Sequence, residues 1–340
     1  MSGREYRVGV VGAGMVGERL VEVLLQRRFP MAELRIMATS ARRQEFAGRP
    51  YDVVAASEDA FDGLDVALFA GTEGESGASK LYGWKAVEKG AFVVDNGGDF
   101  RMDERVPLVV PEVNAHALRR HQGFVANPNC STIQMVMALA PLHRAARLRR
   151  VVVSTYQSVS GTGRPGVRAL REQRQAAAHG GQADLGPYPH VMYNNVIPQV
   201  GSLKGRYAGY YSEEVKMIEE TRKILECPDL PVTATCVRVP VENCHSESIN
   251  AEFERDISVE EARELLSRFE GLVVVDEPEQ SRYPLAADAT GQDAVYVGRI
   301  RKDPSRPNTL DLWCVADNVR KGAATNAVQI VEKAVQMGLL

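Results

Sequence analysis

The chain has 340 residues, of which 44% are hydrophobic and 25% are charged, and its formal net charge is −3. This length suits two domains of ordinary size, and the composition is that of a globular protein. The small net charge gives no electrostatic basis for binding nucleic acid or an anionic membrane surface, and excludes both as predicted partners.

Strands alternate with helices over the first third of the chain. The apolar runs predict strands at 6–11, 33–39, 64–70 and 91–96, with helices at 18–26 and 77–90. This alternation is typical of a Rossmann-like, doubly wound parallel sheet in the α/β class.

The pattern changes after residue 130. Helices are predicted at 131–146, 212–226, 258–269 and 323–337, and strands at 150–161, 232–241, 248–255, 294–303 and 309–317. Ser258 is expected to cap its helix, with Glu261 closing a capping box. Residues 162–212 are rich in Gly, Pro, Tyr and Asn and are expected to form long loops. One-sided alternation in the strands predicts an α+β domain with a largely antiparallel sheet.

A glycine-rich turn, Gly12-x-Gly14-x-x-Gly17, lies between the first strand and the first helix. In this context it predicts a dinucleotide site that also includes Met15 and Val16, because a helix N-terminus can face a pyrophosphate. The second strand ends without the acid that would bind ribose hydroxyls. Ser40 and Arg42 stand there instead, which favours the 2′-phosphate of NADP, although an ordinary surface arginine is the alternative.

Cys130 follows Asn127-Pro-Asn129 and begins a long apolar helix. The N–H groups and dipole at a helix start favour a thiolate and can bind the oxyanion of a tetrahedral intermediate. The five cysteines have irregular spacing with no CxxC pair, so we expect reduced thiols, no metal site and no disulfide framework. Cys244, beside His245, is the rival nucleophile. Spacing alone does not choose a base among the six histidines.

No apolar run approaches the roughly 18 residues that span a bilayer. The first residues also lack an apolar segment with a cleavage site. We therefore expect a cytoplasmic protein.

Several motifs occur in an order that resembles the aspartate-β-semialdehyde dehydrogenase family over nearly the whole chain. They are NPNCST (127–132), EEVKMIEETRKIL (213–225), CVRVPVENCHSE (236–247), VGRIRKD (297–303) and ADNVRKGAATNAVQI (316–330). The resemblance implies an NADP-binding domain of residues 1–129 plus the C-terminal helix 320–340, and a catalytic and dimerisation domain of residues 130–319.

The resemblance also implies roles for individual residues. Cys130 is the expected thioester nucleophile, His245 the general acid/base and Gln157 the residue that orients the substrate. The substrate-binding residues implied are Arg238 for the carboxylate, Glu213 for the amine, Arg101 and Lys216 for the phosphate, and Asn129. Ser160, Gly161 and Asn318 resemble positions beside the nicotinamide.

The implied reaction is the reversible, NADPH-dependent conversion of L-aspartyl-4-phosphate to L-aspartate 4-semialdehyde, in the biosynthesis of lysine and diaminopimelate, threonine and methionine. The implied assembly is a homodimer or a dimer of dimers. Alternatives are a related acyl-CoA reductase, an N-acetylglutamyl-phosphate reductase, and a non-catalytic NADP-binding paralogue.

Three segments depart from the family pattern. The turn GAGMVG is one residue shorter between its first two glycines than the usual GxTGxVG. Asn96-Gly97-Gly98-Asp99 replaces Asn-Ser-Ser before Arg101, and residues 70–80 carry unusual acids. In a strand, Asp99 and Arg101 would share a face, where the acid could weaken phosphate binding or hold the arginine in place.

Overall fold

The structure, a computed structural model, describes residues 3–181, 183–203 and 205–340, and within them the chain divides into two compact units. The N-terminal unit comprises residues 3–129 and Ala323–Leu340. The C-terminal unit comprises Cys130–Gly322.

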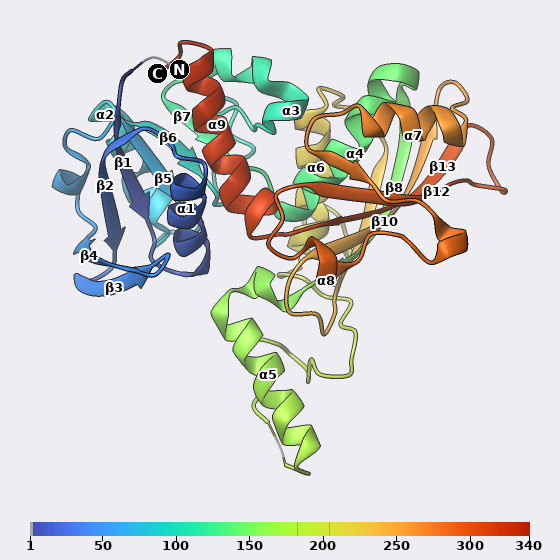
Figure 1. Cartoon of the computed structure of the whole chain (residues 1–340), viewed down its shortest axis with the longest axis horizontal. Coiled ribbons are helices and arrows are strands. Elements are labelled where there is room, and N and C mark those ends of the chain that lie inside the picture. Colours follow the sequence, from blue (N-terminus) through green and yellow to red (C-terminus); the bar gives the residue numbers. More distant parts are fainter. Residues whose placement is uncertain (1–2, 182, 204) are drawn as a thin grey trace. The chain divides into compact units, whose positions relative to one another are not determined.

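The N-terminal unit is built on a mainly parallel sheet with the strand order β3-β4-β2-β1-β5-β6-β7 (Figure 1). Its strands are β1 (Tyr6–Val11), β2 (Met31–Ala38), β3 (Arg42–Phe46), β4 (Arg49–Ala55), β5 (Val66–Phe69), β6 (Phe92–Asp95) and β7 (Phe124–Ala126). Its helices are α1 (Met15–Gln26), α2 (Ala78–Glu88), α3 (Pro111–Asn114) and α9 (Thr325–Gln336). The predicted doubly wound α/β sheet is confirmed.

The hairpin of β3 and β4 is an addition that the sequence reading did not predict. The two strands pair antiparallel, and β4 joins the sheet through parallel pairing with β2. Ala47 and Gly48 connect them with φ values of 49° and 74°, which is the geometry of a tight two-residue hairpin turn. Arg42, which was expected at the end of the second strand, is the first residue of this edge strand.

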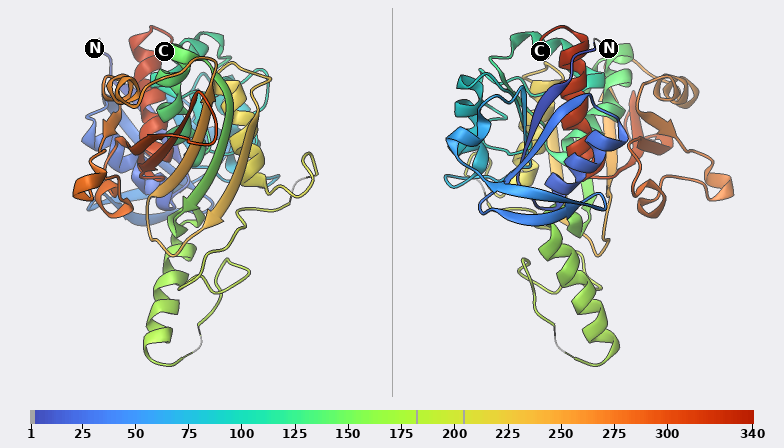
Figure 2. Two further views of the ribbon diagram at one scale, coloured as in Figure 1. Left: turned by 90° about the vertical axis from the view of Figure 1, so that its right-hand side faces the viewer. Right: turned by 60° about the vertical axis from the view of Figure 1, so that its left-hand side comes forward.

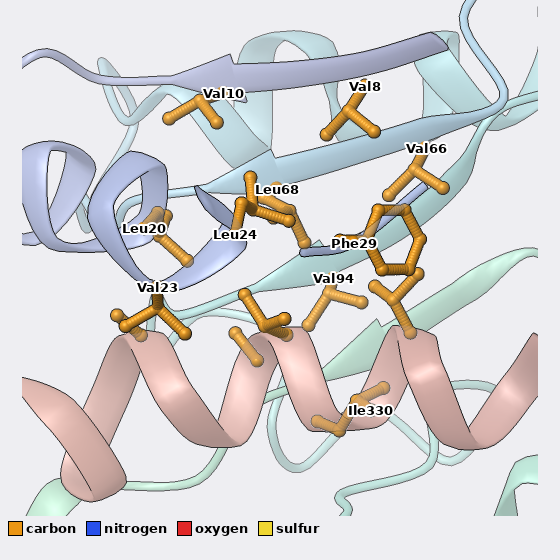
Figure 3. Packing of buried hydrophobic residues seen from close by; sticks show 14 of the residues in the cluster. Val8, Val10, Leu20, Val23, Leu24, Phe29, Val66, Leu68, Val94 and Ile330 are labelled. Atoms are coloured by element: carbon orange, nitrogen blue, oxygen red, sulfur yellow. The ribbon is translucent and has the colours of Figure 1, made fainter. Parts of the chain in front are cut away.

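The last helix completes the core of the N-terminal unit. Ile330 of α9 is 0% exposed and packs in one cluster with α1 residues such as Val23 and with the strand residue Val94 (Figure 3). Burial of a side chain of this size stabilises the fold by about 1.5–3 kcal/mol. Residues from the two ends of the chain therefore share one hydrophobic core.

The C-terminal unit contains a mixed sheet with the order β11-β12-β13-β10-β8-β9 (Figure 2). Its strands are β8 (Leu148–Gln157), β9 (Val232–Arg238), β10 (His245–Phe253), β11 (Leu272–Val274), β12 (Val295–Lys302) and β13 (Thr309–Ala316). The pairs β8–β9 and β11–β12 are parallel and the remaining neighbours are antiparallel, so the predicted largely antiparallel sheet is confirmed.

Helices α4, α6 and α7 pack against this sheet, and α4 also packs against α6 and α7. The helices of the unit are α4 (Cys130–Ala146), α5 (Arg164–Ala178), α6 (Ser212–Ile224), α7 (Val259–Ser267) and α8 (Ala286–Ala289). Ser258 caps α7 by accepting the N–H of Glu261 at 3.0 Å, as predicted. The Glu261 carboxylate pairs with Arg255 and also accepts the backbone N–H of Ser258, which is the reciprocal half of the predicted capping box.

The expectation of long loops over 162–212 is wrong for its first part, because α5 occupies Arg164–Ala178. Alanine, glutamine and arginine, which dominate this stretch, are strong helix formers, and Pro165 is well tolerated in a first turn. The helix projects away from the sheet of its unit (Figures 1 and 2). A small apolar cluster of Val159, Leu170, Met192 and Ile197 holds its base.

No helix within the described part of the chain is both long and apolar enough to cross a membrane.

Candidate active site

One edge of the C-terminal sheet gathers the side chains singled out from the sequence. Gln157 ends β8 and Arg238 ends the parallel strand β9, and the two residues are directly paired. The antiparallel strand β10 begins at this same edge with His245, which pairs with Ala316 at the end of β13. The directions of the strands therefore bring together residues that are far apart in the sequence, such as Gln157 and His245, which are 88 positions apart.

Cys130 is the first residue of α4 and is partly exposed. Gly322 packs closely behind it: a Cβ atom at Gly322 would lie 2.8 Å from the Cβ of Cys130. The amide of Gln157 donates to Ser131 Oγ at 2.7 Å, which ties the sheet edge to the first turn of the helix. The thiol thus stands at a helix N-terminus beside the ends of the strands.

The side chain of Gln157 is fixed by two hydrogen bonds that its amide donates. Its Nε2 donates to Ser131 Oγ and, at 3.0 Å, to the Oε1 of the buried Glu213. Its Oε1 is buried and has no hydrogen-bond partner among the described residues. The acceptor oxygen is therefore the atom that this fixed amide can offer to a substrate.

Ser158 orients the ring of His245, which is 0% exposed. The backbone N–H of Ser158 donates to His245 Nδ1 at 3.1 Å, and the Ser158 hydroxyl lies 3.1 Å from the same atom. A nitrogen that accepts an N–H bond carries no proton, so these bonds assign the proton of the neutral ring to Nε2. Burial and the nearby Arg238 guanidinium hold the pKa of His245 well below its ordinary value.

Arg238 is buried and fixed by its backbone contact. Its Nη1 donates to the carbonyl oxygen of Ser158 at 2.7 Å. A Cβ atom at Gly161 would lie 2.9 Å from this nitrogen and 3.3 Å from the ring of His245. Only glycine at position 161 lets the chain pass this close to both side chains.

A hydroxyl and amide network lies next to His245. The hydroxyls of Ser158 and Ser160 both donate to Asn318 Oδ1, at 3.0 and 3.1 Å. Ser160 Oγ also interacts with Asn243 Oδ1 at 2.9 Å. Ser160, Gly161 and Asn318, singled out separately in the sequence, are therefore close together around the loop that follows β8.

Glu213 and Lys216 belong to α6 and lie three residues apart, on one face of the helix. Glu213, in the first helical turn, is in direct contact with Gln157. Lys216 is half-buried.

In the N-terminal unit, the turn from Gly12 to Gly17 has the space that a phosphate group requires. A Cβ atom at Gly17 would lie 1.7 Å from the carbonyl oxygen of Gly12, so this glycine is needed for the turn itself. Around Gly14, by contrast, a Cβ would meet nothing within 4 Å. Gly14 is the N-cap of α1, so the N–H groups of the next residues, Met15 and Val16, belong to the first helical turn and have no partner within the helix, as a bound phosphate requires.

Strand β3 holds Arg42 near this turn, because Gln44 on the same strand contacts both Arg42 and the turn. Arg42 Nε donates to Gln44 Oε1 at 3.0 Å, and its Nη1 donates to the carbonyl oxygen of Ser40 at 3.2 Å. Gln44 Nε2 in turn donates to the carbonyl oxygen of Ala13 at 2.9 Å. An exposed guanidinium is thereby held beside the glycine turn, where it fits a phosphate on the adenosine ribose.

Arg101 is buried within the N-terminal unit. It donates to the carbonyl oxygens of Asn127, at 2.9 Å, and Asn96, at 2.7 Å. The expected strand geometry for Asp99 is wrong, because β6 ends at Asp95 and residues 97–102 form a bend and turn. Asp99 accepts the backbone N–H of Gly74 at 2.9 Å and so fastens the 70–77 loop.

Comparison with known proteins finds relatives along nearly the whole chain. A family model described as the NAD binding domain of semialdehyde dehydrogenase matches residues 7–121, and one described as the dimerisation domain matches residues 139–321. The aspartate-semialdehyde dehydrogenase of Aquifex aeolicus is 46% identical, over 98% of this chain and 99% of its own length. That of Bacillus subtilis is 43% identical over 99% and 100%.

The chain belongs to the aspartate-semialdehyde dehydrogenase family.

Solved structures of this family have the same fold. Aspartate-semialdehyde dehydrogenase II of Vibrio cholerae superposes with a TM-score of 0.92 at 40% identity, over 98% of this chain and 99% of that one. A second structure of the Vibrio cholerae protein, in complex with ASA, gives a TM-score of 0.92 at 39% identity. Family membership makes this chain an oxidoreductase with a nicotinamide dinucleotide-binding domain.

Three residues at the edges of the candidate site were missed by sequence reasoning, although they lie within or next to the family motifs. Ser131 and Ser158 follow Cys130 and Gln157 directly, and Gln44 lies two residues after Arg42. Each acts by positioning a neighbour that had been singled out. Adjacency to a candidate residue was the only signal in the sequence that could have indicated them.

Proposed function

We propose that this chain catalyses the reversible, NADPH-dependent reductive dephosphorylation of L-aspartyl-4-phosphate to L-aspartate 4-semialdehyde through a thioester on Cys130. This step serves the synthesis of lysine and diaminopimelate, threonine and methionine. The observation that carries the proposal is the placement of Cys130 at a helix start in the unit whose sheet edge holds Gln157, Arg238 and His245.

The dinucleotide fits the residues that are present. Gly12, Gly14, Met15 and Val16 would hold its pyrophosphate, while Ser40 and Arg42 would hold the 2′-phosphate. Ser160, Gly161 and Asn318 would lie beside the nicotinamide. When bound, NADPH supplies the hydride.

Cys130 performs the covalent chemistry. Its thiolate attacks the acyl carbon of aspartyl phosphate, a carbon–sulfur bond forms, the acyl–oxygen bond breaks, and inorganic phosphate leaves. The N–H groups at the start of α4 stabilise the oxyanion of this tetrahedral intermediate. In the opposite direction phosphate attacks the thioester and regenerates the thiolate.

His245 acts at the oxygen of the reacting carbon. Its Nε2 carries the ring proton, because Ser158 occupies Nδ1, and this N–H donates a hydrogen bond to the oxyanion that exists after reduction of the thioester, while the proton stays on the ring. As the carbonyl reforms, the carbon–sulfur bond breaks, the semialdehyde is released and the thiolate returns. The low pKa of His245 keeps the ring neutral, so Nδ1 remains available to Ser158 at physiological pH.

The remaining residues bind the charged groups of the substrate. Gln157 orients it through Oε1, and Arg238 faces its carboxylate. Glu213 binds its amine, Arg101 and Lys216 bind its phosphate, and Asn129, the buried residue before Cys130, completes the set. Each ionic group of the substrate thus has an opposite charge in the chain.

The protein acts on a small-molecule substrate and carries the family's dimerisation domain, which supports a homodimer. We place the enzyme in the cytoplasm, with association of two dimers as the larger assembly. The exposed apolar residues near α5, including Leu185, Tyr193 and Val196, are candidates for burial in that assembly.

The test is a phosphate-dependent NADP reduction assay with aspartate semialdehyde. Succinate semialdehyde, and CoA in place of phosphate, should be poor substitutes, and efficient use of CoA would assign the chain to the acyl-CoA reductases instead. Cys130→Ala should lower kcat on the order of 10⁴-fold or more while NADP binding is kept. Cys227→Ala, at another partly exposed thiol, is the matched control and should remain active.

A further inference from the structure

Glu247 is a fully buried acid that the proposed mechanism does not use. It lies on β10 two residues after His245, so the two side chains point to the same face of the sheet. The side chain is 0% exposed, and neither carboxyl oxygen has a hydrogen-bond partner among the described residues. Because an isolated buried carboxylate is very unfavourable, this group requires either a proton or a donor.

Gln134 of α4 is a second buried side chain with an unmet hydrogen bond. Its Nε2 donates to the backbone carbonyl oxygen of His245 at 3.4 Å, and its Oε1 has no partner among the described residues. The carbonyl of His245 can only accept, so it fixes which end of the amide faces it. Nε2 carries a second hydrogen, and its interaction with the carboxyl of Glu247 lowers the pKa of that carboxyl.

An amide oxygen and an ionised carboxylate are both acceptors and cannot satisfy each other. A single proton on the carboxyl satisfies both. We propose that Glu247 and Gln134 form a buried positioning pair for His245: the carboxylic acid O–H of Glu247 donates to Gln134 Oε1, and Gln134 Nε2 donates one hydrogen to the carbonyl oxygen of the acid and the other to the backbone carbonyl of His245.

The surroundings of Glu247 favour a neutral acid. Burial raises the pKa of its carboxyl well above the ordinary value, and Gln134 offsets only part of this increase. Burial also raises the pKa values of the thiols of Cys236 and Cys314. The groups around the carboxyl are Thr155 of β8, Cys236 of β9, Cys314 of β13, Gln134 of α4 and His245 on its own strand.

Thr155 can complete the arrangement. It lies directly opposite Glu247 in the pairing of β8 with β10, and its buried hydroxyl interacts with the thiol of Cys236 but has no oxygen or nitrogen partner among the described residues. Side chains at such positions are about 5 Å apart at Cβ, so the hydroxyl can donate to the carbonyl oxygen of the acid. Every buried polar atom of the pair then has a partner.

The consequence for the reaction is geometric. Ser158 fixes the ring of His245, and the pair fixes its backbone. Gln134 lies one helical turn after Cys130, so the pair connects the helix of the nucleophile to the strand of the acid/base. Glu247 is therefore a positioning residue that acts through Gln134.

The inference rests on the proposed function, and its test compares Glu247→Gln with Glu247→Leu in the assay above. Glutamine is neutral and can donate to Gln134, so kcat should stay within about twofold of the wild type. Leucine cannot donate, and kcat should fall about 10- to 100-fold while the KM for aspartate semialdehyde changes little. Gln134→Met should reproduce the fall if Glu247→Leu does not fold. Equal kcat in the leucine variant and the wild type would overturn the pair.

The pH profile of kcat tests the protonation state. The profiles of the wild type and Glu247→Gln should coincide, because one neutral group replaces another. If Glu247 were ionised, removing its charge would lower the pKa of His245 and shift the profile, and the proposal would fail.

Hydrogen exchange tests the pair without turnover. Hydrogen exchange of the backbone amides of residues 130–137 and 245–250 is measured by mass spectrometry. These amides should exchange faster in Glu247→Leu than in the wild type, and at the wild-type rate in Glu247→Gln. A wild-type chain that does not turn over aspartate semialdehyde would refute the proposed function only. Identical exchange in the leucine variant and the wild type would refute the pair.

Discussion

Replacing Glu247 with glutamine should stabilise the C-terminal unit, and the gain should grow as the pH rises. In the folded chain burial raises the pKa of Glu247 well above its ordinary value, whereas the unfolded chain ionises near that value, about 4.3. Between the two pKa values the folded state binds one more proton than the unfolded state. The stability of the wild type therefore falls with rising pH, and glutamine, which binds no proton, escapes this loss.

The size of the effect follows from proton linkage. One bound proton changes the free energy of unfolding by about 1.4 kcal/mol per pH unit. A unit of this size gains about 2–4 °C in Tm for each kcal/mol, so the difference in Tm should widen by about 3–6 °C per pH unit above pH 5. Scanning calorimetry of both proteins from about pH 4 to 8, at one ionic strength and one protein concentration, measures it.

Glu252 provides a control on the same strand with the opposite sign. Its hydrogen bond with Arg306 lowers the pKa of its carboxyl. Its contribution to stability is present above the ordinary glutamate pKa and is lost as the pH falls. Glu252→Gln should therefore become less stable relative to the wild type as the pH rises through about 4 to 5. A Tm difference for Glu247→Gln that does not depend on pH would refute the reasoning, since it would mean an ordinary pKa in the folded chain.

Two further predictions concern the binding residues. Arg42→Ala should lower kcat/KM for NADPH about 10-fold, the value of one charge-assisted hydrogen bond, and leave kcat/KM for NADH almost unchanged. Arg43→Ala, on the opposite face of the same strand, is the control. An equal loss for both dinucleotides in Arg42→Ala would exclude a role at the 2′-phosphate. Glu213→Ala should raise the KM for aspartate semialdehyde about 10-fold or more, because a buried charged contact with the amine is lost; an unchanged KM would remove Glu213 from the substrate site.

Much of the fold could be predicted because long strands and helices have strong periodicity. Strands β1, β5 and β8 are apolar runs of the expected length, and helix α4 is a long apolar segment that follows a proline-containing turn. The missed strand β3 (Arg42–Phe46) is a polar edge strand, whose formation depends on pairing with β4 and not on its own pattern. Helix α5 was missed because the glycine and proline content of the surrounding residues outweighed the helix-forming residues inside it.

The candidate site could be predicted only in part. Cys130 has a local signal, a thiol at a predicted helix start. The roles of Gln157, Arg238 and His245 came from family resemblance, because no local pattern shows that three strand ends meet. The contacts of Ser158 with His245 depend on an antiparallel strand that returns to the same edge, and sequence spacing does not encode such a contact.

The contribution of α9 to the N-terminal core has a consequence for synthesis on the ribosome. All residues of the C-terminal unit are made before α9, so that unit has its complete sequence while the first sheet still lacks the helix that carries Ile330. The N-terminal unit, whose first residues are made first, is thus the last to have its complete sequence. Until residues 323–340 emerge, the apolar face that α9 covers stays available for binding by a chaperone or for aggregation.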